Sequence, residues 1–221
     1  EMLAALDLGY GELYREMLRR GAPGISVDKD GMMLVAGANR LVRAAIRTDP
    51  NLPAREFLGR IDTFFRQRQM DHHIVTRAPQ DTDIDELLQD AGFEPEYVES
   101  VMCLQRKPEA PHVPTHGAIK EVRDVRGAKD FAATVSAAFG EPGISEAVIT
   151  GPNSLIAPHI RSFVGYLNGE PVATALAMLH AGGAGVFWVG TVNEARHHGF
   201  GSALVRTAAS AGFDMGARFA W

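Results

Sequence analysis

The segment "ARHHGFGSALVRTAAS" (195–210) places residues that could bind phosphate between an apolar run and an amphipathic run. Gly199 and Gly201 lack a Cβ, so the backbone there can come close to a ligand. The first N–H groups of a helix have no partner within the helix, and the helix dipole makes that end positive. Arg196 and two histidines add donors around the same point. The pattern indicates either a phosphate-binding loop or a plain turn between a strand and a helix.

Two glycines separated by one residue are weak evidence by themselves. With 23 glycines in 221 residues, about two such pairs are expected by chance. The sequence contains three, at Gly9/Gly11, Gly183/Gly185 and Gly199/Gly201. Only the third follows an apolar run and precedes an amphipathic one. A Rossmann-type dinucleotide loop would need a third glycine where this chain has Leu204. The context therefore permits a phosphate site at the first turn of a helix, whereas a plain turn between a strand and a helix remains the simpler interpretation of the loop taken alone.

The elements around this loop predict a mixed sheet. Residues 185–192 ("GVFWVGTV") read as a buried strand, a helix follows over about 201–213, and "ARFAW" (217–221) reads as the start of another strand. Continuous apolar runs on both sides of an amphipathic helix indicate neighbouring parallel strands. Because the sequence ends inside the second run, we expect this domain to be incomplete at Trp221.

The first half of the chain has a similar order of elements. Asp30-Gly31 and, in the second half, Asn168-Gly169 are hairpin signals. Further predictions for the first half are a strand over 39–46, a helix over 53–68 and a closing strand over 97–106. We therefore predict an α/β (α+β) fold with two domains, each a mixed central sheet covered by helices. The domains span 1–106 and 117–221, and the proline-containing stretch 107–116 is the linker.

Composition excludes several classes of function. The net charge of −5 argues against a nucleic-acid partner, and no apolar run is long enough for a membrane span. The chain has one cysteine, so no intrachain disulfide can form and we expect a reducing, cytoplasmic location. This residue, Cys103, falls in the expected closing strand, so we predict a buried, inert thiol. The pairs His72-His73 and His197-His198 lack the spacing of a zinc site, so no metal is expected.

Residues 185–221 resemble the cofactor-binding segment of the GCN5-related N-acetyltransferase (GNAT) superfamily. The family motif R/Q-x-x-G-x-G/A is matched by Arg196, Gly199 and Gly201. The resemblance implies an N-acetyltransferase that moves an acetyl group from acetyl-CoA to the amine of a small molecule or peptide, by direct attack in a ternary complex. It also implies a monomer or homodimer. The alternative is a non-catalytic acyl-CoA-binding or scaffold module.

The same resemblance implies the residues of the cofactor site. Backbone groups of Val189 and Thr191 would bond to the acetyl carbonyl and the pantetheine arm, and backbone N–H groups from His197 to Ser202 would hold the pyrophosphate. Arg196 would shape the loop. The two histidines stand at variable positions of the motif, where they could make binding depend on pH near neutrality. The expected cofactor-binding residues are Val189, Gly190, Thr191, Arg196, His197, His198, Gly199, Phe200, Gly201 and Ser202.

The first half lacks this motif. The stretch after its expected strand, "RTDPNLPAREF" (47–57), has no glycine pair, and Pro50 and Pro53 remove two N–H donors. The resemblance therefore implies a tandem protein with a degenerate N-terminal copy.

The catalytic residues are not identified from the sequence. The tyrosine that acts as the acid in many GNAT enzymes would lie beyond Trp221. Glu141, Glu146 and Glu194 are candidate bases, although solvated loop charges are the simpler interpretation for all three.

Overall fold

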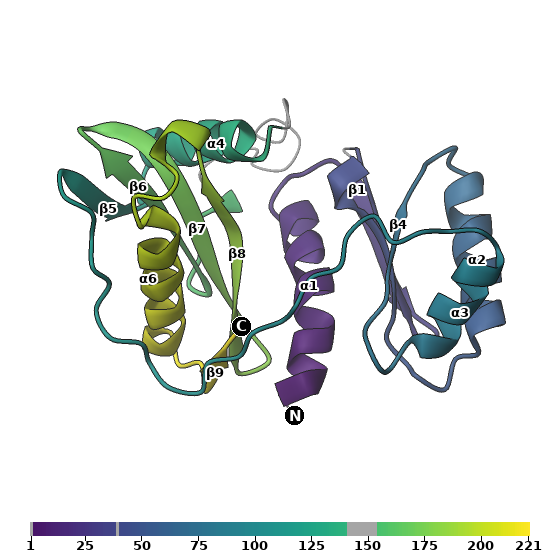
Figure 1. Ribbon diagram of the computed structural model, residues 1–221. Coiled ribbons are helices and arrows are strands. Elements are labelled where there is room, and N and C mark those ends of the chain that lie inside the picture. Colours follow the sequence, from purple (N-terminus) through teal and green to yellow (C-terminus); the bar gives the residue numbers. More distant parts are fainter. Residues whose placement is uncertain (1, 39, 141–153) are drawn as a thin grey trace. The chain divides into compact units, whose positions relative to one another are not determined.

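The computed structural model describes residues 2–38, 40–140 and 154–221 (Figure 1). The chain divides into two compact units, one formed by Tyr10–Val101 and the other by residues up to Gly9 together with Met102–Trp221. Each unit contains one mixed sheet with helices on it. The predicted fold class is therefore confirmed.

The first unit is built on a four-stranded sheet with the order β1-β2-β3-β4. Its elements are α1 (Met2–Arg19, of which residues 10–19 belong to this unit), β1 (Gly24–Lys29), β2 (Met32–Gly37), the 3-10 helix η1 (Arg40–Val42), β3 (Arg43–Arg47), α2 (Ala54–Arg66), β4 (His73–Val75) and α3 (Thr82–Asp90). Strands β1, β2 and β3 are antiparallel, whereas β4 runs parallel to β3.

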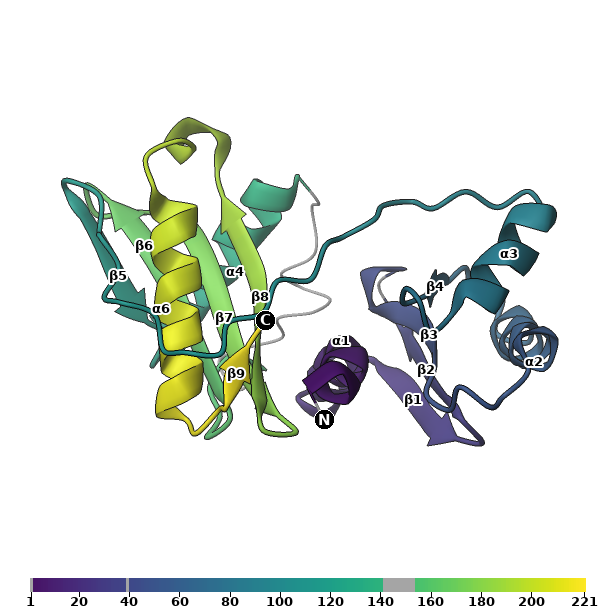
Figure 2. The same ribbon diagram turned by 60° about the horizontal axis from the view of Figure 1, so that its bottom comes forward.

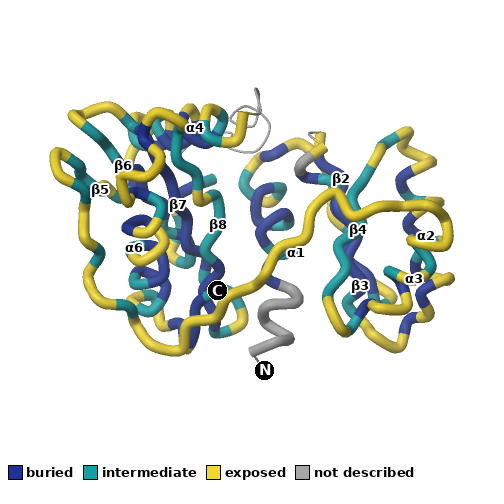
Figure 3. The backbone as a smooth tube through the Cα atoms, viewed as in Figure 1, coloured by how far each residue is buried: buried dark blue, intermediate teal, exposed yellow. Residues whose placement is uncertain are grey.

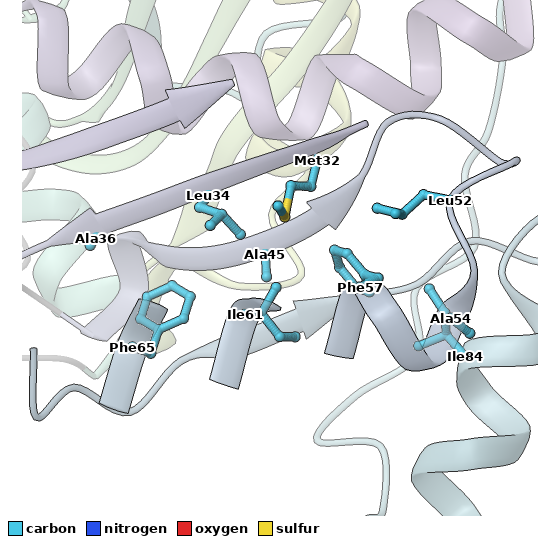
Figure 4. Packing of buried hydrophobic residues seen from close by; sticks show 10 residues of the cluster. All are labelled: Met32, Leu34, Ala36, Ala45, Leu52, Ala54, Phe57, Ile61, Phe65 and Ile84. Carbon is cyan, nitrogen blue, oxygen red and sulfur yellow. The ribbon is translucent and has the colours of Figure 1, made fainter. Parts of the chain in front are cut away.

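Helices cover both faces of this sheet. Figure 4 shows Phe57, Ile61 and Phe65 of α2 packed on Leu34 and the other even-numbered residues of β2. The spacing of the three α2 residues at every fourth position gives the helix one apolar face. On the opposite face, a side chain at Gly11 of α1 would clash with Met33 and Ile46, so a glycine lets the helix lie close to the sheet.

The second unit contains a five-stranded sheet with the order β5-β6-β7-β8-β9. Its elements are β5 (Gly117–Glu121), α4 (Val125–Phe139), β6 (Ile160–Leu167), β7 (Glu170–His180), β8 (Gly183–Thr191), the 3-10 helix η3 (Asn193–Ala195), α6 (Phe200–Asp214) and β9 (Phe219–Ala220). Strands β5 to β8 are antiparallel, and β9 is parallel to β8 through the pairs Gly183↔Phe219 and Ala184↔Ala220. The predicted parallel pair on either side of the helix is confirmed.

Helix α6 lies on one face of this sheet and α4 on the other (Figure 2). On the sheet face that α6 covers, β7 contributes small residues. Its Ala173, Ala175 and Ala177 pack in one cluster with Leu204 and Ala208 of the helix. Helix α4 begins after Asp124, whose carboxylate accepts the N–H of Gly127 at 2.8 Å, and ends at Gly140 in the left-handed conformation. Both ends are standard helix caps.

The two units repeat one arrangement. In each, a helix precedes three antiparallel strands, and a second helix then leads to a strand that is parallel to the third. The hairpins at Asp30-Gly31 and Asn168-Gly169 are formed as predicted, because all four residues have the positive φ that their turns require. The loop 48–53 of the first unit therefore corresponds in topology to the loop 192–199 of the second.

The predicted closing strand over 97–106 is wrong. Residues 91–107 are all exposed (Figure 3), and their only ladder contact within the described chain is a single antiparallel bridge between Leu104 and Ala220. Cys103 is accordingly exposed instead of buried. The alternation of apolar residues was present, but no neighbouring strand pairs with it. The predicted strand over 39–46 is also shorter, because η1 occupies residues 40–42.

Candidate functional site

The candidate site is the connection from β8 to α6. Gly199 caps the start of α6 with φ +90°, and His197 two residues earlier has φ +63°. Left-handed residues in a loop of this kind turn backbone N–H groups toward a shared concavity. The N–H of Ala203 donates to the carbonyl of Gly199 at 3.0 Å, which begins the helical hydrogen bonding. The N–H groups of the three preceding residues, Phe200 to Ser202, lie in the first turn and are free of that ladder.

The space in front of this turn is open. A Cβ built on Gly201 would meet only the Oγ1 atom of Thr191, at 3.8 Å, among the described residues. A Cβ on Gly199 would meet only Cγ of Pro114, at 4.0 Å, in the same part of the chain. Phe200 between them is buried under the sheet and anchors the turn. The backbone of the first turn is therefore accessible to a ligand, and its dipole favours an anion.

Arg196 braces the loop from the side. Its Nε–H donates to the carbonyl of Thr191 at 3.1 Å, and its Nη2 donates to the carbonyl of Ala138 at 3.3 Å. The first of these carbonyls ends β8, and the second lies in the last turn of α4. The guanidinium group is thus engaged with backbone oxygen atoms on both sides of the loop.

The two histidines of the motif are exposed. The Nδ1 atom of His198 lies 2.8 Å from the carbonyl oxygen of Arg196. Since a carbonyl oxygen only accepts, Nδ1 carries the proton in this contact. His198 therefore supports the turn through one ring nitrogen and leaves the other for solvent or a ligand.

Strand β8 is bulged just before the loop. The pairing with β7 shifts between Thr174 and Leu176, and Trp188 has φ +53°. The hydroxyl of buried Thr174 donates to the Trp188 carbonyl at 2.8 Å, which satisfies a group that the bulge removes from the ladder. Val189 next to it is 36% exposed. The bulge gives backbone groups of β8 a direction that a regular strand would not allow.

The end of α4 packs on this bulge. The ring of Phe139 meets Trp188 edge to face, with centroids 5.9 Å apart. A Cβ on Gly190 would lie 2.8 Å from the Cβ of Ala138, so only glycine permits this close approach. The site therefore combines an open helix N-terminus, a bulged strand and an aromatic pair.

The structure brings the ten predicted cofactor-site residues together at the end of β8 and the start of α6. Glu194 is exposed on η3 beside them, whereas Glu141 and Glu146 lie outside the described residues. His72 stacks on Phe65 in the first unit, and burial lowers its pKa. No cluster of three or more metal-ligating side chains occurs among the described residues. In that part of the chain, no helix is long and apolar enough to cross a membrane.

Sequence reasoning missed three parts of the site: Thr174, Ala138 and Phe139. Thr174 stands in an apolar strand, and the α4 residues read as ordinary helix core. Their roles depend on a bulge and on a contact across more than 50 positions, for which the sequence pattern contains no local signal. The positive φ of Trp188 could not be predicted from the sequence either, because a positive φ is uncommon for residues other than glycine.

No protein-family model matches the sequence, and no curated protein matches it. Several solved structures, in contrast, are similar to this chain. The chain has the fold of the GCN5-related N-acetyltransferases, which confirms the resemblance at the level of the fold. A GCN5-related N-acetyltransferase from Kribbella flavida is 17% identical, with 96% of this chain and 84% of that chain covered and a TM-score of 0.62. A second, from Sphaerobacter thermophilus, is 16% identical, with coverages of 88% and 71% and a TM-score of 0.57.

Replacing Gly199 with alanine should destabilise the second unit by about 1 kcal/mol, because a Cβ is strained at its φ of +90°. Gly59 gives the matched control. It is exposed within α2, has nothing within 4 Å of a built Cβ and has no positive φ. Gly59→Ala should therefore stabilise the first unit slightly. Thermal unfolding of both variants measures the difference, and equal melting temperatures would mean that the loop does not need a left-handed residue.

Proposed function

We propose that the second unit binds acetyl-CoA at the β8–α6 connection and that the protein is a GNAT-type N-acetyltransferase. The observation that carries this proposal is the uncovered first turn of α6, with glycine at 199 and 201, directly after a bulged strand. Backbone N–H groups from His197 to Ser202 would hold the pyrophosphate. A phosphate group would lie against Gly201, where a built Cβ would meet only the Oγ1 atom of Thr191, at 3.8 Å, among the described residues.

The rest of the cofactor would follow β8 toward its bulge. Backbone groups of Val189 and Thr191 would orient the pantetheine arm and the acetyl carbonyl. In the transfer, the acceptor amine would attack the thioester carbon, the carbon–sulfur bond would break, and the thiolate would take up a proton. Trp188, at the bulge, and Phe139, which packs on it edge to face, would lie beside the acetyl group. The proposed acceptor is an amine of a small molecule or peptide.

The first unit is proposed as a degenerate copy of the same domain, within residues 1–106, with 107–116 as the linker to the acetyl-CoA-binding domain. Its counterpart of the loop contains Pro53 at the cap of α2, which has no N–H to donate. A cytoplasmic location remains part of the proposal.

Calorimetric titration with acetyl-CoA tests the binding step. We expect acetyl-CoA and CoA to bind one site per chain, and NAD to bind far more weakly, because the loop lacks the third glycine of a dinucleotide site. Release of free thiol in the presence of a panel of amines then separates the enzyme from a non-catalytic acyl-CoA-binding module. Absence of acetyl-CoA binding to the folded chain would contradict the proposal, and binding without transfer to any amine would favour the module.

A further inference from the structure

Arg196 is the one residue of the motif whose side chain joins two elements. Its guanidinium donates to the carbonyl of Thr191 at 3.1 Å and to that of Ala138 at 3.3 Å. These two residues are 53 positions apart in the sequence and belong to different layers, one in the sheet and one in the helix on its face. These bonds hold the Arg196 guanidinium beside the β8–α6 loop (192–199, here called the cofactor loop), and its donors point to backbone carbonyl oxygen atoms.

The contact with Ala138 completes the end of α4. The last carbonyls of a helix have no partner within it, and the dipole makes that end negative. The N–H of Gly140 donates to the carbonyl of Ser136, and Arg196 donates to the carbonyl of Ala138 two residues later. A cation at this position is favourable in charge as well as in hydrogen bonding. The loop between β8 and α6 thus supplies a cap for a helix that it does not adjoin in sequence.

The end of α4 is also the part that packs on the bulge of β8. Phe139 contacts Trp188 edge to face, and the backbone at Gly190 lies against Ala138. A shift of the last turn of α4 would move the Phe139 ring and release Trp188. The contacts therefore run without interruption from the loop, through Arg196, to the aromatic pair beside the proposed acetyl position.

We propose that Arg196 is a positioning residue that couples the cofactor loop to the aromatic pair Phe139–Trp188, an inference that rests on the proposed acetyl transfer at this site. Arg196 acts by holding the end of α4 against the bulge. Its loss should lower the rate of transfer more than it weakens acetyl-CoA binding, because the pyrophosphate is held by backbone groups. Lysine should not replace it, since a single ammonium group does not reproduce the planar fork that reaches both carbonyls.

The experiment compares Arg196→Met and Arg196→Lys in a Trp221→Phe background, where Trp188 is the only tryptophan. Without ligand, we expect a changed Trp188 emission and at least tenfold faster hydrogen exchange in the last turn of α4. In catalysis, we expect kcat to fall at least tenfold and the acetyl-CoA Kd to rise less than fivefold. Arg206→Met on the exposed side of α6 is the matched control and should leave all four quantities unchanged.

The opposite result would identify Arg196 as a phosphate ligand. In that case the Kd would rise steeply and in a salt-dependent way, while Trp188 emission and exchange in α4 would stay as in the parent protein. That outcome would overturn the positioning role. The ligand-free measurements keep this test separate from the proposed function: if the parent protein bound no acetyl-CoA, the proposed function would fail, whereas emission and exchange would still decide whether Arg196 holds α4.

Discussion

Replacing Gly201 with glutamate should abolish acetyl-CoA binding and leave the second unit folded. The position is open, since a Cβ there meets only Thr191, at 3.8 Å, among the described residues. The added carboxylate would stand where the pyrophosphate is proposed to lie and would repel it. Losing two or three charge-assisted bonds, at about 1.5–3 kcal/mol each, corresponds to a loss of affinity of at least about a hundredfold. Calorimetric titration with acetyl-CoA measures the loss.

The matched control is Gly59→Glu in α2 of the first unit. This glycine is also open and helical, with nothing within 4 Å of a built Cβ, so the two variants carry the same change of charge and size. Gly59→Glu should bind acetyl-CoA like the parent protein. Thermal melts of both variants show whether they are folded. Near-native affinity of Gly201→Glu would mean that the loop is only a turn.

Local chemistry explains which parts of the fold could be predicted from the sequence. A hairpin such as Asn168-Gly169 depends on two adjacent residues that tolerate a positive φ, and an amphipathic helix such as α2 depends on one spacing of apolar residues. The β8–loop–α6 segment is likewise continuous in sequence, so its glycines and apolar runs predict both the parallel pairing of β8 with β9 and the open first turn.

Long-range partners explain what could not be predicted. The alternation in residues 97–106 is correct for a strand, but a strand forms only where a neighbour offers its backbone, and the described chain provides one bridge, at Leu104. Cys103 is exposed for the same reason. The bulge at Trp188 and the contact of Arg196 with Ala138 arise from packing between layers. Neither feature produces a repeating pattern of apolar residues from which it could be predicted.

Arg47 is the clearest case of a partner that the sequence does not reveal. It ends β3 and is 2% exposed, and its Nε–H donates to Asp81, which is fully buried, at 3.0 Å. It also donates to both carboxylate oxygens of Asp83, at 2.8 and 2.7 Å, and to the carbonyl of Leu52 at 3.1 Å. Leu52 lies in the loop before α2 and its cap Pro53, so one bond of this network ends in the loop that corresponds in topology to the loop before α6.

Replacing Arg47 with methionine should therefore destabilise the first unit by about 3 kcal/mol, because it leaves the buried carboxylate of Asp81 with Arg77 as its remaining partner. The matched control is Arg60→Met on α2, which breaks an exposed pair with Glu56 and should cost at most about 0.5 kcal/mol. Both tryptophans lie in the second unit, so hydrogen exchange of residues 10–101 is the appropriate measurement. Exchange that is equally fast in both variants would contradict the prediction.

The effect of Arg47 should also depend on pH in a defined direction. Hydrogen bonds from Arg47 lower the pKa of Asp83 in the folded state. A carboxyl group with a lowered pKa contributes stability above its unfolded pKa of about 3.9 and loses it as the pH falls through the folded value. The part of the difference between the parent protein and Arg47→Met that comes from Asp83 should therefore be full at neutral pH and be lost below about pH 4. A constant difference would mean that the ion pair with Asp83 contributes nothing measurable to it. Acetyl-CoA binding at neutral pH should be unchanged in Arg47→Met, because the proposed site lies in the second unit.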